Sequence, residues 1–323
     1  MLKKKIICIT GQNGFLGQHL FNTLKLYPEK YILKEFKRSY FENPKILKEV
    51  FSDCDVIVHL AALNRHERPK IIYNTNVLLV KKIVDVLNKL KNKPHLITSS
   101  STQENQINEY GKSKLEGRKI FSDWAKNSKS CFTGMLIPNI YGPFCKPNYN
   151  SFIATFCRKL INDETPKIID DNEIALIFVS SLIDKFIKII DLSHDEHRCI
   201  IKSDIKIKVS EVLKKLFHMH SLYFKVGKIP KISSEFDLNL FNTFRSYIDY
   251  KTYFPRKYKD NFDERGSFVE LIRSEIGGQF SFSTTLPGVT RGNHYHTRKI
   301  ERFSVIKGKA LIEIRKIGTK NKI

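Results

Sequence analysis

Apolar and polar positions alternate in a regular order over the first part of the chain. A β-branched run at 5–10 precedes a helical pattern at 18–26, and a second strand-like run follows at 31–36. An amphipathic helix is then predicted from 76 to about 90, with a further strand at 96–99. Strands that alternate with helices indicate a doubly wound parallel sheet, so we expect an α/β fold of the Rossmann type.

Towards the C-terminus, alternation with a period of two replaces the helical period. Strand-like segments are predicted at 279–285, 303–306 and 310–314. An aromatic, basic and turn-rich stretch precedes them and suits a connection between domains. We therefore expect an α/β domain at 1–245, a linker at 246–259 and a partial all-β domain at 260–323.

Composition narrows the class of protein. Of 323 residues, 41% are hydrophobic, which is enough for a core. The six cysteines form no C-x-x-C pair, which favours reduced thiols and a cytoplasmic protein, and no apolar run is long enough to span a membrane. The net charge of +23 is spread along the chain, so we expect an anionic small substrate and no nucleic-acid partner.

A glycine-rich turn joins the first predicted strand to the first predicted helix. It contains Gly11, Gly14, Phe15, Leu16 and Gly17, in the spacing G-x-x-G-x-x-G. In this context the first glycine permits a tight turn, the second admits a pyrophosphate, and the third lets the helix pack close to its strand. The turn therefore predicts a dinucleotide site at the start of the helix.

The end of the second predicted strand bears on the choice of dinucleotide. Lys37 and Arg38 lie about 20 residues beyond the glycines, where a carboxylate favours NAD and a cation accommodates a 2′-phosphate. Glu35 lies close by and keeps NAD open as the alternative. We expect NADPH.

The predicted buried strand at 55–62 ends in the small turn Leu60, Ala61 and Ala62. Small side chains there allow the backbone to lie against a cofactor. His59, at the end of this strand, is interpreted as a residue of the packed interior that forms a hydrogen bond.

Three residues form the candidate catalytic set. Ser101 ends a serine-rich strand, and Tyr110 and Lys114 follow, four residues apart, so that they share one face of a helix. A nearby ammonium is expected to lower the tyrosine pKa from its ordinary value of about 10, and the serine hydroxyl can bind the same substrate oxygen.

A candidate metal site lies near the C-terminus. His294 and His296 are two residues apart and Glu301 follows, between Gly288 and Gly308. On adjacent strands these three side chains form a set of ligands suited to zinc or a similar divalent metal.

These motifs carry a family resemblance. Residues 1 to about 245 resemble the extended short-chain dehydrogenases/reductases, in the glycine turn, the Tyr-Lys pair and the segment 138–143. The resemblance implies that Asn139 borders a nucleotide-sugar site. Leu136 stands where the family often has arginine, which weakens the transfer of further substrate contacts in this segment.

The run 146–153 and the C-terminal motif together resemble the CapF-type bifunctional enzymes of UDP-N-acetyl-L-fucosamine biosynthesis. Those enzymes join a reductase to a cupin epimerase. The spacing G-x5-H-x-H-x4-E-x6-G is similar to the first of two cupin motifs. We therefore expect a truncated cupin with weak metal binding and no C3-epimerase activity, and exposed strand edges that a partner chain covers in a homodimer.

The resemblance implies NADPH-dependent reduction of the C4 ketone of a UDP-2-acetamido-2,6-dideoxy-hexulose to the L-talo sugar. In this interpretation Tyr110 protonates the C4 oxygen, Lys114 holds the nicotinamide ribose and Ser101 binds the carbonyl. Two alternatives stay open. One is a nucleotide-sugar 4-epimerase or dehydratase that recycles bound NAD, and the other is a non-catalytic scaffold that binds sugar nucleotides.

Overall fold

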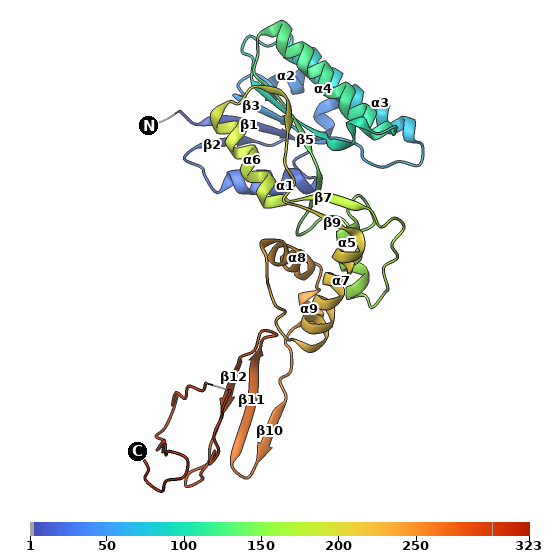
Figure 1. Ribbon diagram of the computed structural model, residues 1–323. Coiled ribbons are helices and arrows are strands. Elements are labelled where there is room, and N and C mark those ends of the chain that lie inside the picture. Colours follow the sequence, from blue (N-terminus) through green and yellow to red (C-terminus); the bar gives the residue numbers. More distant parts are fainter. Residues whose placement is uncertain (1–2, 299) are drawn as a thin grey trace. The chain divides into compact units, whose positions relative to one another are not determined.

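The structure is a computed structural model that describes residues 3–298 and 300–323 (Figure 1). The chain divides into two compact units. The larger contains residues up to 257 together with 272–279, and the smaller contains 258–271 and 280–323. In the described part of the chain, no helix combines the length and the apolar character needed to cross a membrane.

A six-stranded parallel sheet forms the centre of the larger unit, in the order β2-β1-β3-β4-β5-β8. This arrangement confirms the predicted doubly wound α/β fold. The strands are β1 (Lys5–Thr10), β2 (Tyr31–Lys34), β3 (Val56–His59), β4 (His95–Ser101), β5 (Phe132–Ile137) and β8 (Glu196–Ile200). The helices around them are α1 (Phe15–Lys25), α2 (Pro44–Phe51), α3 (Pro69–Leu87), α4 (Glu109–Ser128) and α6 (Val179–Leu192), with 3-10 turns η1 (Arg38–Glu42) and η2 (Thr102–Asn105).

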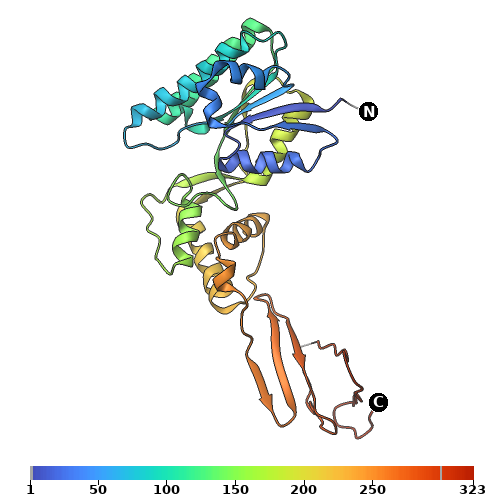
Figure 2. The ribbon, with the colours of Figure 1, turned by 180° about the vertical axis from the view of Figure 1, so that it is seen from behind.

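Both faces of this sheet are covered because alternate strand residues point to opposite sides. Ile7 and Ile9 of β1 pack with residues of α1 and α6, such as Phe186. Cys8, between them, packs on the other side with residues of α3 and α4, such as Phe121. The pair α3 and α4 lies over that second face (Figure 1, and Figure 2 from behind).

Helix α3 begins at Pro69, seven residues before the predicted start at Asn76. Proline suits the first position of a helix because its fixed φ is helical and it needs no amide partner there. The buried Ile72 extends the apolar face into this first part of the helix. Asn76 consequently lies inside the helix.

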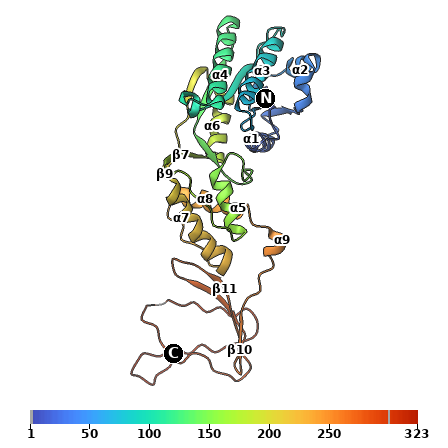
Figure 3. The same ribbon diagram turned by 90° about the vertical axis from the view of Figure 1, so that its right-hand side faces the viewer.

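A second core completes the larger unit. It surrounds a small sheet in the order β6-β7-β9, in which β6 is parallel to β7 and β9 is antiparallel. Figure 3 shows its helices most clearly. The elements are β6 (Asn139–Tyr141), α5 (Phe152–Ile161), β7 (Glu173–Phe178), β9 (Ile205–Lys208), α7 (Val209–Met219), the π-helical η3 (His220–Val226), α8 (Glu235–Arg245) and α9 (Tyr250–Tyr253).

The first half of the stretch predicted as a linker, 246–259, packs against the second core. Tyr247 and Ile248 are buried in the second core, and the Tyr247 hydroxyl donates to the Cys145 carbonyl over 2.6 Å. The short helix α9 follows. Aromatic residues in this stretch therefore pack against the second core, which the local composition alone does not reveal.

The C-terminal strands are β10 (Asp260–Asp263), β11 (Gly266–Arg273) and β12 (Gln279–Ser283), in an antiparallel sheet that confirms the predicted all-β character. The prediction of strands at 303–306 and 310–314 is wrong, because the described residues there form no strand. Phe303, Ile306 and Leu311 are exposed. A period of two does not make a strand without a neighbouring strand to accept its hydrogen bonds.

Candidate functional site

The carboxyl ends of the parallel strands bring most of the predicted site residues to one edge. In the order β2-β1-β3, the chain leaves β1 for one neighbour and later returns on its other side. Such a reversal opens a crevice beyond the strand ends, where ligands bind in doubly wound folds. The glycine turn follows β1, the turn at 60–62 follows β3, and Ser101 is the last residue of β4.

The glycine turn is shaped for close contact. Gly11 has φ +76°, and a Cβ added there would lie 2.7 Å from the Ala61 amide nitrogen. A Cβ on Gly17 would lie 2.2 Å from the Gly11 carbonyl oxygen. Leu60 donates its amide to Thr10, so the turn after β3 is held against the glycine turn. Only glycine permits this approach of α1 to β1.

The N-terminus of α1 remains free to bind an anion. Its N-cap is Gly14, and no side chain caps the helix or places an acid in the first turn. Phe15 and Leu16 form that first turn. The unpaired amides and the helix dipole together suit a phosphate group, so these residues fit the pyrophosphate of a dinucleotide.

Lys37 and Arg38 lie just after β2, and both are exposed. The Gln12 side-chain oxygen accepts the Phe36 amide over 3.0 Å, which ties the glycine turn to this strand end. Glu35 is exposed as well. Both a carboxylate and two cations are thus available where a ribose would lie.

Tyr110 and Lys114 share a face of α4, as the spacing predicts. The Lys114 Nζ lies 5.7 Å from the centre of the Tyr110 ring and donates to the Ser99 carbonyl over 2.9 Å. The Asn108 side chain caps the helix by accepting the Gly111 amide over 2.7 Å. The cap and the bond to β4 hold the pair beside the serine-rich strand end.

The prediction that Lys114 lowers the pKa of Tyr110 is wrong. Burial raises the pKa of Tyr110 to about 12, and the neighbouring Tyr149 adds to the rise. Burial also lowers the pKa of Lys114 to about 8, against the opposing effect of the Glu104 carboxylate. Desolvation is the largest cause of both pKa shifts, and Lys114 is not among the groups that shift the pKa of Tyr110. At neutral pH Tyr110 keeps its proton, which is the state that a proton donor requires.

Ser101 is buried at the end of β4. Its Oγ accepts the Gln103 amide over 3.1 Å and so caps the turn η2. An accepting hydroxyl still has its own hydrogen to donate. Ser101 is therefore able to donate to a substrate oxygen while it holds the turn.

Two residues behind this site were not identified from the sequence. The Glu104 carboxylate accepts from Arg118 at Nε over 2.8 Å and at the second guanidinium nitrogen over 2.7 Å, and the Ser100 hydroxyl also donates to it. Arg118 lies four residues after Lys114 on α4. One feature of the sequence points to Arg118: it lies four residues after Lys114, as Lys114 lies four after Tyr110, and residues four apart share a helix face.

Asn76 is a further positioning residue that the sequence did not reveal. Its side chain accepts the Leu63 amide over 2.7 Å and donates to the Leu63 carbonyl and to the Ser113 hydroxyl. It thereby links the segment after β3 to α4. His59 is buried and bonded to the Thr10 hydroxyl over 2.7 Å, which confirms the predicted interior histidine that forms a hydrogen bond. Burial lowers its pKa to about 3.

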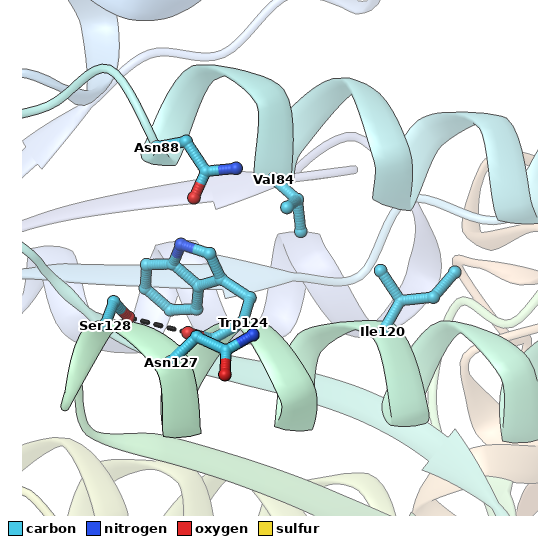
Figure 4. Close-up of a pocket in the computed structure, with 6 residues that line it drawn as sticks. All are labelled: Val84, Asn88, Ile120, Trp124, Asn127 and Ser128. Atoms are coloured by element: carbon cyan, nitrogen blue, oxygen red, sulfur yellow. Dashed lines mark hydrogen bonds between the residues drawn. The ribbon is translucent and has the colours of Figure 1, made fainter.

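Two cavities lie near α4. One, of about 20 Å³, is lined by polar groups that include His59, Asn76 and Lys114, and has room for about one water. A larger cavity of about 260 Å³ lies between α3 and α4, beside Trp124 and Asn88 (Figure 4). The residues lining the larger cavity are apolar or neutral, so it offers no acid or base for catalysis.

Asn139, in β6, is exposed, and Leu136 is buried in β5. The loop that follows β6 carries Tyr149, which lies close enough to Tyr110 to raise its pKa. Tyr149 is therefore a further neighbour of the site, from the run 146–153 that the sequence singled out.

The predicted metal ligands lie together in the smaller unit. The Nε2 atoms of His294 and His296 are 3.1 Å apart, and His296 lies 3.5 Å from the Glu301 carboxylate. The ligand atoms of all three lie within 4.8 Å of one another. Two imidazoles and one carboxylate at this separation fit a divalent transition metal. None of the three lies on a strand, contrary to the prediction, and all are exposed.

Known proteins match both parts of the chain. Residues 7–197 match the NAD dependent epimerase/dehydratase family, and residues 261–323 match the polysaccharide biosynthesis C-terminal domain. A UDP-2-acetamido-2,6-beta-L-arabino-hexul-4-ose reductase of Pseudomonas aeruginosa is 30% identical over 315 residues, which cover 97% of this chain and 83% of that protein.

Solved structures agree with these matches. The capsular polysaccharide assembling protein CapF of Staphylococcus aureus is 31% identical, with a TM-score of 0.76 over 90% of this chain and 79% of that one. An NADPH complex of RMD from Pseudomonas aeruginosa, 17% identical, has a TM-score of 0.64 over 76% of this chain and 99% of that one and shares the fold. The chain belongs to the NAD-dependent epimerase/dehydratase family, as a CapF-type reductase with a C-terminal polysaccharide-biosynthesis domain.

Proposed function

We propose that this protein reduces the C4 ketone of a UDP-2-acetamido-2,6-dideoxy-hexulose with NADPH and forms the L-talo sugar used in capsule or O-antigen biosynthesis. The relative from Pseudomonas aeruginosa is named as a reductase of a UDP-hexul-4-ose, which supports the substrate class. The observation that carries the reaction type is Tyr110, a protonated phenol beside a lysine at the carboxyl edge of the sheet.

The residues of the larger unit have distinct tasks in this proposal. Tyr110 donates its hydroxyl proton to the C4 oxygen, and Ser101 donates a hydrogen bond to the same oxygen. Lys114, fixed by the Ser99 carbonyl, holds the ribose hydroxyls and offsets the charge that forms on the tyrosine oxygen. NADPH supplies the hydride when it is bound.

The proposal also assigns the remaining contacts. Gly11, Gly14 and the first turn of α1 hold the pyrophosphate, and Lys37 and Arg38 hold the 2′-phosphate. Ala61 lies against the cofactor, and Asn139 borders the sugar nucleotide. We assign these roles to residues 1–245. In residues 260–323, His294, His296 and Glu301 would hold a divalent metal weakly, without C3-epimerase activity.

The test is NADPH oxidation by the purified full chain with a UDP-4-keto-6-deoxy-N-acetylhexosamine. Tyr110→Phe should lose about 10²–10⁴-fold in rate, the usual contribution of a positioned proton donor. Tyr27→Phe is the matched control, since this exposed tyrosine lies outside the site. An unchanged rate in Tyr110→Phe would refute the assignment, and turnover with bound NAD and no net NADPH consumption would favour an epimerase or dehydratase.

A further inference from the structure

The edge strand β8 contains a bulge opposite β5. Thr133 pairs with Glu196, but Met135 pairs with Cys199, so β8 advances three residues while β5 advances two. Residues three apart in a regular strand point to opposite faces. The extra residue brings the side chains of Glu196 and Cys199 onto one side, with their ligand atoms within 4.8 Å of each other.

His194 completes a cluster with these two residues. Its Nε2 lies 2.9 Å from the Glu196 carboxylate. The ligand atoms of His194, Glu196 and Cys199 all lie within 4.8 Å of one another. Neither the proposed reduction nor the metal binding assigned to His294, His296 and Glu301 uses any of them.

The backbone beneath the cluster is held by the central sheet. The Thr133 hydroxyl donates to the His194 carbonyl, and the Phe132 amide donates to the Asp195 carboxylate over 2.9 Å. Both donors belong to the start of β5, which lies inside the parallel sheet. The backbone that carries the three ligands is therefore held in place by β5, so less ordering is needed when an ion binds.

We propose that His194, Glu196 and Cys199 form a second metal site, which binds Zn²⁺ or a similar thiophilic divalent ion. An imidazole nitrogen, a carboxylate oxygen and a thiolate sulfur suit zinc, and sulfur and nitrogen ligands disfavour magnesium and calcium. Three protein ligands leave one tetrahedral position for water. Binding replaces the thiol proton of Cys199, which is released to solvent.

A purely stabilising role explains the cluster less well. The side chains of His194 and Glu196 are 47% and 45% exposed, and an ion pair at such exposure contributes little to stability. An ion pair between His194 and Glu196 also does not explain why the bulge places the Cys199 thiol beside them.

The test uses Co²⁺ as a spectroscopic substitute for Zn²⁺ and the full chain with His294→Ala and His296→Ala, which removes the other histidine pair. We expect one bound Co²⁺ per chain and a thiolate-to-cobalt charge-transfer band in the near ultraviolet. Cys199→Ser should abolish the band and weaken Zn²⁺ binding at least tenfold, and His194→Gln should weaken binding without removing the thiolate.

Cys131→Ser is the matched control, because the Cys131 thiol bonds to the neighbouring Ser193 carbonyl but lies outside the cluster. The charge-transfer band should persist in the Cys131→Ser variant. Circular dichroism and the thermal midpoint would verify that each variant is folded. Absence of the band in the starting chain, or its persistence in folded Cys199→Ser, would overturn the proposal, and so would its loss in folded Cys131→Ser.

Discussion

Glu104 and Arg118 form a two-bond ion pair behind the candidate catalytic lysine, with only 3% and 11% of their side chains exposed. The carboxylate also acts on Lys114, whose pKa it raises against the larger effect of burial. Arg118 reaches further, to the His197 carbonyl of the edge strand, over 3.2 Å. The pair thus joins the turn after β4, helix α4 and the edge strand β8.

Loss of one partner of this pair should destabilise the fold. Glu104→Gln leaves the guanidinium buried without a countercharge, and breaking a buried pair in this way costs about 3–5 kcal/mol. Urea unfolding measures the change. Adding Arg118→Met should restore part of the loss, because it removes the unpaired charge. If Glu104→Gln lowers the free energy of unfolding by less than about 1 kcal/mol, water must solvate the unpaired Arg118 guanidinium.

The buried ammonium of Lys114 predicts a pH dependence of stability. Its pKa is about 8 in the folded chain and 10.5 ordinarily, so between these values the unfolded chain binds more protons. The contribution of Lys114 to stability is therefore unfavourable below pH 8 and improves as the pH rises through this window. Lys114→Met should be more stable than the parent near neutral pH, by a margin that shrinks towards pH 10.5.

Chemical denaturation at a series of pH values measures this margin in the cofactor-free protein. Lys112→Met is the matched control, since Lys112 lies on the same helix but is exposed. A margin that stays constant with pH, or that grows, would contradict the lowered pKa.

The two glycines of the turn should separate folding from cofactor binding. Gly17→Ala places a Cβ 2.2 Å from the Gly11 carbonyl, and overpacking of this kind typically costs about 1–3 kcal/mol. At Gly14 the same contact is 3.2 Å, and φ is negative, so the fold should tolerate Gly14→Ala. That variant should instead bind NADPH more weakly, because it adds a methyl group at the N-cap of α1, beside the amides that we assign to the pyrophosphate.

Thermal midpoints and NADPH titration by fluorescence distinguish the two effects. Equal thermal midpoints for the parent and Gly17→Ala would mean that α1 moves away from β1 at little cost.

Removal of the cations after β2 should reduce cofactor selectivity. With Lys37→Ala and Arg38→Ala together, the ratio of kcat/KM for NADPH to that for NADH should fall at least tenfold, because the charge on the 2′-phosphate loses both partners. Lys45→Ala, an exposed lysine in α2, is the control and should leave the ratio unchanged. A parent protein that prefers NADH would show that Glu35 sets the specificity.

The site at His294, His296 and Glu301 should bind Zn²⁺ weakly. All three ligands are exposed in the described structure, and affinity depends on surrounding groups that orient the ligands and exclude water. We expect no exchange of the C3 proton of the keto sugar with deuterium at a catalytic rate. Such exchange, if His296→Ala abolished it, would show that a working epimerase site forms.

Local pattern determined the fold class and much of the site. The alternation of strands and helices, the glycine turn and the four-residue spacing of Tyr110 and Lys114 lie within short segments. Such features are encoded locally, because side-chain direction follows the periods of the helix and the strand. Local sequence does not determine the start of α3. Pro69 allows a helix to begin there but does not require it, so the pattern predicts a start at Asn76 instead.

Tertiary structure decided what depends on distant neighbours. The pKa of Tyr110 lies above its ordinary value because the surrounding chain buries the side chain and Tyr149 lies nearby, and the depth of burial cannot be read from spacing. Glu104 meets Arg118 only because η2 packs against α4. The segments at 303–306 and 310–314 alternate like strands but form none in the described part of the chain. A strand needs a neighbouring strand for its backbone hydrogen bonds, whereas a helix satisfies its own.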